Sequence, residues 1–263
     1  MERKYYENPD HWDPNLYIGA EAIRRQITVE WIPEDVKTVC DVGCGNGTLT
    51  NQVNKSHFTV GVDRSLAALR WTDQYRCQAD IASIPFADNS FDLVVSTEVI
   101  EHLPYNIYIL GLSEIVRVAR RYILISVPYY EDLELKRAEC PKCGCKFHST
   151  YHMRNYKSED IQYLFNKWKC VKLLRAEGIV KENIPIFIRE HTILRRGLLG
   201  GGSKFPKAAL CPQCGFSYEP ELDTGQNEGR IESETSPLIS FIKLLWPKRI
   251  KPHWWLALYE KQN

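Results

Sequence analysis

The sequence contains no run of about 18 consecutive apolar residues, the length that a membrane-spanning helix needs. Residues 1–7 are largely polar and no apolar core follows them, so no secretory signal peptide is expected. The formal net charge is only +1, which provides no overall field to attract nucleic acid. These absences favour a cytoplasmic protein without a strong nucleic-acid signal.

The composition indicates a globular protein with an unusual number of thiols. With 263 residues, of which 44% are hydrophobic and 25% charged, the chain can bury one large α/β core that carries an insertion. In a reducing compartment, its nine cysteines are more often free thiols or metal ligands than disulfides.

The stretch from Val39 to Thr48 is an apolar run that breaks into three glycines, Gly43, Gly45 and Gly47. It predicts a buried parallel strand that turns sharply into a helix, where a ligand can lie against the backbone. A second buried strand is expected at residues 58–63. Its last residue is an aspartate, whose carboxylate suits the two hydroxyls of a ribose.

Two enzyme classes share these features, the nicotinamide-dependent oxidoreductases and the class I S-adenosylmethionine-dependent methyltransferases. Dinucleotide binders use the spacing G-x-G-x-x-G, with a helix N-terminus directed at a pyrophosphate. Here the glycines alternate with single residues, and Asp41 lies two residues ahead of the first. Its carboxylate would repel a pyrophosphate and suits a cationic amino-acid group instead.

Two further segments, 79–86 and 90–103, closely resemble the third and fourth motifs of the class I methyltransferases. The resemblance covers residues 36–130 with all motifs in order. It implies that the glycines pass close to the methionine part of S-adenosylmethionine and that Glu98 faces the methyl group. The carboxylate of Asp80 would accept a hydrogen bond from the adenine amine, and Ile81 would pack against the adenine ring. The implied cofactor-binding residues are Asp41, Gly43, Cys44, Gly45, Gly47, Asp63 (ribose), Arg64, Asp80 and Ile81 (adenine), and Glu98.

Apolar runs and helical spacing alternate along the chain, which predicts βαβ units and a parallel sheet. Strands are expected at residues 37–42, 58–63, 75–79, 91–96, 122–127, 170–176 and 253–260, and helices at 20–29, 48–55, 66–71, 106–119 and 158–168. The family resemblance implies that the last strand inserts antiparallel. The expected fold class is α/β: a doubly wound, mostly parallel seven-stranded sheet with an antiparallel last strand, plus a small zinc-stapled insertion region.

These elements divide the chain into six segments. They are an N-terminal helical cap (1–35), the cofactor-binding core (36–128), a lid insertion with a cysteine pair (129–157), a core helix and strand (158–177), a second insertion with a cysteine pair (178–250) and the last core strand (251–263). The aromatic residues at 5–17 could fold over the cofactor or pack on the first helix. Residues 238–251 combine an apolar face with basic residues, so they could rest on a membrane surface or pack on the domain.

The motif C-P-x-C-G occurs twice, at residues 140–144 and 211–215. Two thiolates of such a knuckle can bind one metal ion, and both insertions leave the sheet at its carboxyl edge, so the knuckles could meet around a structural Zn²⁺ ion. Its ligands would be Cys140, Cys143, Cys211 and Cys214. The first alternative is a zinc site built from residues of the lid insertion alone, and the second is that the protein binds no metal. The local ligands would be Cys140, Cys143, His148 and His152.

Three histidines are candidate catalytic bases. If zinc takes only cysteines, His148 and His152 lie on the lid above the carboxyl edge, where open α/β folds bind ligands. His102 belongs to the core and faces the methyl group in the family resemblance. A near-neutral imidazole can accept the proton of an acceptor hydroxyl. The alternative is that both lid histidines are structural, as metal ligands or their hydrogen-bond partners.

The sequence lacks the Asn/Asp-Pro-Pro-Tyr tetrapeptide that is typical of methylation at exocyclic amines, and residues 96–99 resemble the matching position of small-molecule O- and C-methyltransferases. We therefore expect O-methylation of a small-molecule or glycan-type acceptor, which could be lipid-linked. An RNA or protein methyltransferase is the enzymatic alternative, and a cofactor-binding scaffold without activity is the other. The sequence leaves the oligomeric state open.

Overall fold

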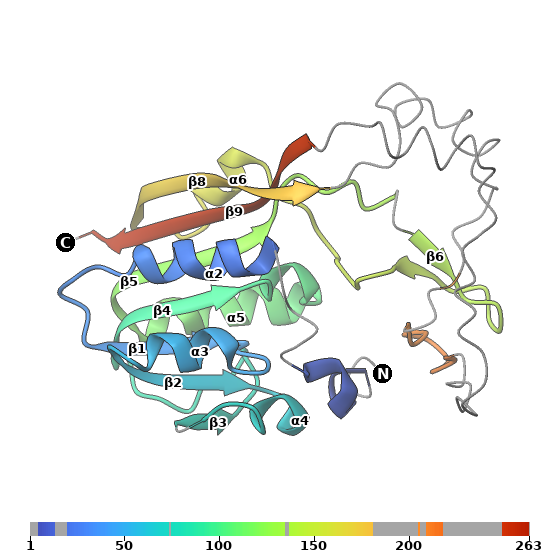
Figure 1. The fold of residues 1–263 in the computed structure, drawn as a ribbon, viewed down its shortest axis with the longest axis horizontal. Helices are drawn as coiled ribbons and strands as arrows, with labels where there is room; N and C mark the ends of the chain where they lie inside the picture. The colour runs from blue at the N-terminus through green and yellow to red at the C-terminus, as the bar shows by residue number, and fades with distance from the viewer. Residues whose placement is uncertain are drawn as a thin grey trace.

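A computed structural model of the chain describes residues 5–13, 20–73, 75–134, 137–180, 205, 209–217 and 249–262. Its centre is a seven-stranded sheet in the order β3-β2-β1-β4-β5-β9-β8 (Figure 1). The strands are β1 (Thr38–Val42), β2 (Phe58–Asp63), β3 (Arg76–Gln78), β4 (Phe91–Thr97), β5 (Ala119–Pro128), β8 (Trp168–Val180) and β9 (Arg249–Lys261). The first five pair in parallel, and β9 runs antiparallel to both β5 and β8. The expected sheet, with its antiparallel last strand, is confirmed.

The strand order indicates where along the sheet a ligand is expected to bind. From β1 the chain moves outward to β2 and β3, and then returns to the other side of β1 to form β4. The order therefore reverses between β1 and β4. Open α/β sheets bind ligands at the carboxyl ends of the strands at such a reversal, because the connecting loops diverge there.

Helices cover both faces of the sheet. In Figure 1, α2 (Ala20–Glu30) and α3 (Thr48–Val53) lie in front of the strands and α5 (Tyr105–Val118) lies behind them. Side chains of β5 alternate between the two layers: Ile123 belongs to the apolar cluster on the α5 side, and Leu124 to the cluster on the α3 side. Each is fully buried, which stabilises the fold by roughly 1.5–3 kcal/mol per side chain.

The lid insertion forms a small unit beside the carboxyl edge. Its strands β6 (Arg137–Glu139) and β7 (Lys146–His148) pair antiparallel, and their apolar side chains cluster with Phe205 and Cys211 of the second insertion. The Tyr151 hydroxyl donates to the Leu210 carbonyl at 2.8 Å, which ties the two insertions together. The Met153 amide donates to the Glu101 carbonyl at 2.8 Å and so joins the lid to the core.

The helices predicted at 48–55 and 66–71 end two residues early, as α3 and α4 (Leu66–Leu69), and the helix predicted at 158–168 differs most from the structure. The expected helix at 158–168 is α6 (Ser158–Gln162), and its N-cap is Lys157, whose amide donates to Asp160. The chain then turns through the left-handed residue Lys167 (φ 65°) into β8. Phe165 packs edge-on against Tyr259 with ring centroids 5.0 Å apart, so this tertiary contact draws the chain away from the helix axis.

The second insertion is shorter than predicted, because β8 and β9 pair as far as Val180 and Arg249. Residues 181–204 and most of the predicted membrane-contacting segment, 238–248, lie outside the described residues, as does 14–17 of the aromatic N-terminal stretch. The N-terminal cap is described as the short 3₁₀ helix η1 (Pro9–Trp12) and helix α2. No helix of the described segments is long and apolar enough to cross a bilayer.

Candidate active site

Two adjoining cavities lie at the carboxyl ends of β1, β2 and β4. The larger has a volume of about 360 Å³ and the smaller about 170 Å³. The residues that line both are Tyr6, Trp12, Gly43, Glu98 and His102. Because the walls are shared, one elongated ligand could extend from one cavity into the other.

The turn after β1 is built from glycines in the left-handed region, with φ angles of 74° at Gly43, 54° at Gly45 and 69° at Gly47. A side chain at the first position would collide with its neighbour, since a Cβ on Gly43 would lie 2.3 Å from Val99 Cγ2. Cys44 lines the larger cavity, but its thiol packs against β2. The turn therefore presents backbone rather than side chains to a ligand.

Among the charged side chains in the wall of the larger cavity, Asp41 and Arg24 are almost buried. The carboxylate of Asp41 is 3% exposed and accepts a hydrogen bond from Thr50 Oγ1 at 2.6 Å. Burial raises the pKa of Asp41 to about 6. Arg24 of α2 is 8% exposed, and its Cζ lies 5.7 Å from the ring centroid of Trp254. Its Nε and Nη1 have no hydrogen-bond partner among the residues that the structure describes, so this guanidinium can still bind an anion.

Asp63 lies at the end of β2 and lines the smaller cavity. Its Oδ2 accepts from the Gly45 amide at 2.9 Å and its Oδ1 from the Ser65 amide at 2.8 Å. Burial raises its pKa, while these two hydrogen bonds act in the opposite direction. Since a carboxylate has about four acceptor positions, Asp63 can still accept from two ligand hydroxyls. Arg64 lines the same cavity and lies over the Tyr6 ring, 4.9 Å from its centroid.

Asp80 and Ile81 line the smaller cavity together with Asp63. The Asp80 Oδ1 accepts from the Ala82 amide at 2.9 Å, which fixes the loop after β3. Ile81 packs closely on Gly111 of α5, where an added Cβ would come within 3.1 Å of it. The smaller cavity thus offers two acids and an apolar side chain in one place.

Glu98 follows β4 and adopts a left-handed conformation with φ 58°, which is rare for a residue other than glycine. Its Oε1 accepts from Ser126 Oγ at 2.7 Å and its Oε2 from Trp254 Nε1 at 3.0 Å. Burial raises the pKa of this carboxyl group. Glu98 lines both cavities, as expected for a residue near their junction, but its carboxylate accepts hydrogen bonds from side chains of β5 and β9.

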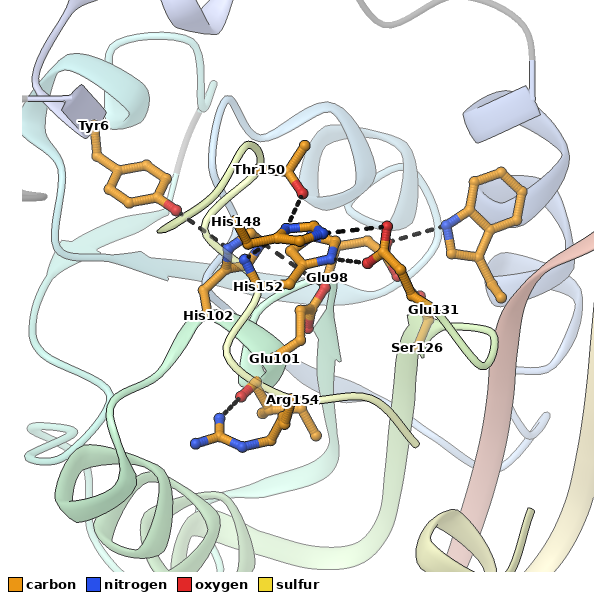
Figure 2. Close-up of polar contacts among 12 residues, drawn as sticks. Tyr6, Glu98, Glu101, His102, Ser126, Glu131, His148, Thr150, His152 and Arg154 are labelled. Atoms are coloured by element: carbon orange, nitrogen blue, oxygen red, sulfur yellow. Dashed lines mark hydrogen bonds and ion pairs between the residues drawn. The ribbon is translucent and has the colours of Figure 1, made fainter. Parts of the chain in front are cut away.

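Three histidines and two glutamates meet where the lid crosses the larger cavity (Figure 2). The ring centroids of His102 and His152 lie 4.7 Å apart, and those of His148 and His152 lie 4.9 Å apart. The carboxylate of Glu131 forms a hydrogen bond with His152 Nδ1 and lies 3.8 Å from His148 Nε2. His102 and His152 line the cavity, and His148 is 6% exposed. All three predicted histidines are therefore brought together.

The fifth member of this group, Glu101, is fully buried. Neither of its carboxylate oxygens accepts a hydrogen bond from any described residue, and His102 Nε2 lies 3.8 Å from its Oε1. Burial, together with the charge of Glu98, raises the pKa of Glu101 well above its usual range. Burial and the neighbouring His152 lower the pKa of His102 to about 3, so that this imidazole is neutral at physiological pH.

The N-terminal segment covers the glycine turn. Trp12 Nε1 and Ser65 Oγ both donate to the Tyr6 carbonyl at 2.6 Å, and Asn46 Nδ2 donates to the Trp12 carbonyl at 3.2 Å. A Cβ on Gly45 would lie 2.8 Å from the Trp12 ring. Of the two interpretations of this segment, the structure supports the one in which it folds over the ligand site.

The four knuckle cysteines form one cluster, although the two knuckles are far apart in the sequence. The sulfur of Cys140 lies 3.7 Å from that of Cys214, and the sulfur of Cys143 lies 3.6 Å from that of Cys211. All four ligand atoms lie within 4.8 Å of one another. Burial opposes ionisation of Cys211, but the backbone amides of residues 213 and 214 lower its pKa to about 6.

The rival local set is not brought together. His148 and His152 belong to the separate group with Glu131, while Cys140 and Cys143 group with the second knuckle. The structure thus places the two lid histidines beside the larger cavity and the thiols in a cluster of their own, which could hold a metal ion.

Comparison with known proteins agrees with this geometry. Residues 40–122 match the sequence family described as the methyltransferase domain. The match spans less than half of the chain and indicates a methyltransferase-like region. The strand order and the antiparallel last strand of the chain are those of a Rossmann-like α/β fold.

An uncharacterised protein of Methanocaldococcus jannaschii is 37% identical over 125 residues, which are 42% of this chain and 54% of that protein. The match therefore spans about half the length of this curated relative. Among solved structures, magnesium protoporphyrin IX methyltransferase from Synechocystis with bound SAH has a TM-score of 0.52 and 18% identity, and covers 68% of this chain and 92% of that one. A methyltransferase of Methanosarcina mazei has a TM-score of 0.50 and 13% identity, and covers 90% and 97%. At these identities the structures show a shared fold.

Sequence reasoning missed three charged residues of the candidate site and its lid. Arg24 and Glu131 lie outside the motifs, and Glu101 lies in the fourth motif without an assigned role; the roles of all three depend on burial and on their spatial neighbours. Glu101 carried one usable signal, its position beside His102 directly after an apolar pair. Arg24 and Glu131 carried none, because each lies next to another residue of like charge.

Proposed function

We propose that the chain binds S-adenosylmethionine and transfers its methyl group to an oxygen atom of a small-molecule or glycan-type acceptor. The observation that carries this proposal is that Asp41 and Arg24 both lie in the wall of one cavity, beside the glycine turn. An amino acid has an ammonium and a carboxylate, and this cavity offers one group of opposite charge to each.

The unused hydrogen-bonding capacity of Arg24 supports the fit of the cofactor. Arg24 Nε and Nη1 are buried without a hydrogen-bond partner in the described segments, which is costly, and a bound carboxylate would satisfy them with charge-assisted hydrogen bonds. The Asp41 carboxylate would accept from the ammonium, and the glycine backbone would lie along the methionine chain. These residues, with Cys44 in the turn, form the methionine part of the proposed site.

The smaller cavity suits the adenosine part. Asp63 has acceptor positions left for the two ribose hydroxyls, and Arg64 beside it borders the same space. Asp80 would accept from the exocyclic amine of adenine while Ile81 packs against the ring. Glu98, at the junction of the two cavities, would lie near the sulfur.

The bound cofactor supplies a methyl group that is already activated by the sulfonium charge, so the protein must mainly align the acceptor and exclude water. Tyr6 and Trp12 cover the glycine turn, and on the proposed acceptor side His102 of the core lies beside His148 and His152 of the lid (Figure 2). An acceptor hydroxyl that enters here could give up its proton to a lid imidazole, whereas the low pKa of His102 makes that ring a poor base. The polar character of the acceptor side favours an oxygen acceptor.

We further propose that the four-cysteine cluster holds a structural Zn²⁺ ion. Tetrahedral thiolate coordination requires sulfur atoms a little under 4 Å apart, given Zn–S distances of about 2.3 Å. The measured pairs at 3.7 and 3.6 Å suit this geometry. Such an ion would join the two insertions and hold the lid over the cavity.

Calorimetric titration with S-adenosylhomocysteine tests the cofactor site. We expect Arg24→Met to weaken binding at least tenfold, because about 1.4 kcal/mol or more of charge-assisted hydrogen bonding is lost. Arg121→Met is the matched control, since Arg121 is exposed and pairs with Asp35. Equal affinities in the two variants would argue against the proposed carboxylate site.

Incubation with methyl-labelled cofactor and fractionated cell extract tests the transfer itself. Label in a small-molecule or lipid fraction supports the proposed acceptor. Label in RNA or protein would instead favour the polymer alternatives, and an unlabelled pool would leave a binding scaffold.

A further inference from the structure

Five ionisable residues lie together on the proposed acceptor side of the site, more than one proton transfer needs: Glu101, His102, Glu131, His148 and His152. Glu101 is fully buried, and neither oxygen of its carboxylate accepts a hydrogen bond from the described part of the chain. Leaving a buried carboxylate without partners is costly, so such groups in native proteins are paired or bind cations. This side chain therefore points to a ligand.

The neighbours of Glu101 are suitable co-ligands. One ligand atom each from Glu101, His102 and His152 lies within 4.8 Å of the other two, and His102 Nε2 is 3.8 Å from Glu101 Oε1. Around a cation with bonds of about 2.1 Å, neighbouring ligand atoms are about 3 Å apart and opposite ones about 4.2 Å. Small rotations of these side chains would close the group around one ion.

The hydrogen bond between Glu131 and His152 is of the kind that accompanies metal-binding histidines. Because Glu131 holds Nδ1, the nitrogen that His152 can offer to a ligand is Nε2. A carboxylate in this position orients the ring and increases its basicity as a ligand. His148 stacks on the same ring with an interplanar angle of 20° and supports its orientation.

The group is open on one side. His102 and His152 line the larger cavity, whereas Glu101 lies beneath them in the core. An ion held by these three side chains would keep free coordination positions toward the cavity, as catalytic metal sites do. The positions face the space that we assign to the methyl acceptor.

We propose that Glu101, His102 and His152 bind one divalent transition-metal cation, such as Mn²⁺, Fe²⁺, Co²⁺ or Zn²⁺, distinct from any ion in the cysteine cluster. Two imidazoles and a carboxylate are the donor set that these cations favour. Cation binding stands on the geometry alone. Its role rests on the proposed function: the acceptor oxygen would coordinate the cation and release its proton to water, and the ionised oxygen would then form the bond to the methyl carbon as the carbon–sulfur bond breaks.

Binding of Mn²⁺ distinguishes the site at Glu101, His102 and His152 from the cysteine cluster, because Mn²⁺ prefers oxygen and nitrogen ligands to thiolates. MnCl₂ is titrated into zinc-loaded full-length protein, and bound Mn²⁺ is measured by the loss of the free-ion electron paramagnetic resonance signal. We expect one Mn²⁺ per chain. Glu101→Gln keeps the shape of the side chain and should weaken binding at least tenfold, as should His152→Asn.

His57→Asn is the matched control, because His57 lies before β2 at the opposite end of the strand from the cavities and should bind Mn²⁺ like the wild type. Titration of every variant with S-adenosylhomocysteine reports folding and the cofactor site independently. Wild-type protein that takes up no Mn²⁺, or Glu101→Gln protein that takes it up equally well, would overturn the inference and show that Glu101 is simply protonated. Mn²⁺ uptake without S-adenosylhomocysteine binding would support the cation site and count against the proposed function.

Discussion

Gly43 lies directly against Val99, so closely that an added Cβ would be 2.3 Å from Val99 Cγ2 and 2.9 Å from Cγ1. The glycine turn after β1 and the segment after β4 are thus packed together without space for a side chain. Because these two segments form the walls of the proposed methionine site, their packing decides its shape.

Gly43→Ala should therefore weaken S-adenosylhomocysteine binding at least tenfold and destabilise the protein by about 1–3 kcal/mol, through both the contact and the positive φ. Gly144→Ala is the matched control, since Gly144 has φ 70° but no atom within 4 Å of an added Cβ. Calorimetry and thermal melting measure the two effects. Adding Val99→Ala should restore part of the affinity of Gly43→Ala, and no restoration would show that the contact is not the cause.

Asp41 should make stability and binding respond to pH in opposite ways. Burial raises its pKa to about 6, so the native state holds a proton that the unfolded chain has already released between about pH 4 and 6. The contribution of Asp41 to stability is greatest below pH 4 and falls as the pH rises through 6. Its cost at pH 8 is up to about 3 kcal/mol.

Asp41→Asn should consequently melt at a higher temperature than the wild type at pH 8, with little difference at pH 4. The same variant should bind S-adenosylhomocysteine at least tenfold more weakly, because the ammonium group loses its counter-charge. Melting curves at the two pH values and calorimetry at pH 8 provide the measurements. Unchanged affinity would remove Asp41 from the cofactor site.

Cys211→Ser tests the four-cysteine cluster. Wild-type protein should retain about one zinc ion per chain in elemental analysis, and the variant should lose it and melt at least about 5 °C lower, since binding energy at a structural site contributes to stability. Cys170→Ser, which changes a thiol in β8, is the control. Zinc retained by Cys211→Ser would return the metal to the local set with His148 and His152.

The fold could be predicted from the sequence largely because its signals are local. The apolar run before Gly43 and the acid at the end of β2 specify a strand, a turn and a second strand within a few residues of each element. The helix predicted at 158–168 failed for the opposite reason. Its boundary is set by packing against Tyr259, a residue from the last strand of the sheet.

The candidate site was predictable only in part. Glu98 was expected in the segment that faces the methyl group, and it lines both cavities, but no local pattern reveals that its carboxylate accepts a hydrogen bond from Trp254. Likewise, Arg24 and Glu101 are ordinary charged residues in the sequence and become notable only because the fold buries them. The pairing of the two knuckles was accessible because the topology places both insertions at the same edge.

Glu131→Gln tests the role of the lid. Loss of the carboxylate that orients His152 should lower the rate of methyl transfer about 10–100-fold, because the ring is no longer held in one tautomer and position. Affinity for S-adenosylhomocysteine should stay within about twofold, since Glu131 is not among the residues that line either cavity. Glu134→Gln is the control, because Glu134 is exposed on the same loop and pairs with Arg137. Equal rates in the two variants would contradict this role.

The central claim is that the glycine turn and the acids around it hold a sulfonium cofactor. Isothermal titration of the purified chain with S-adenosylhomocysteine and, separately, with NAD tests it most directly. We predict one S-adenosylhomocysteine bound per chain with micromolar or tighter affinity and no heat of binding with NAD. Binding of NAD without any response to S-adenosylhomocysteine would contradict the account.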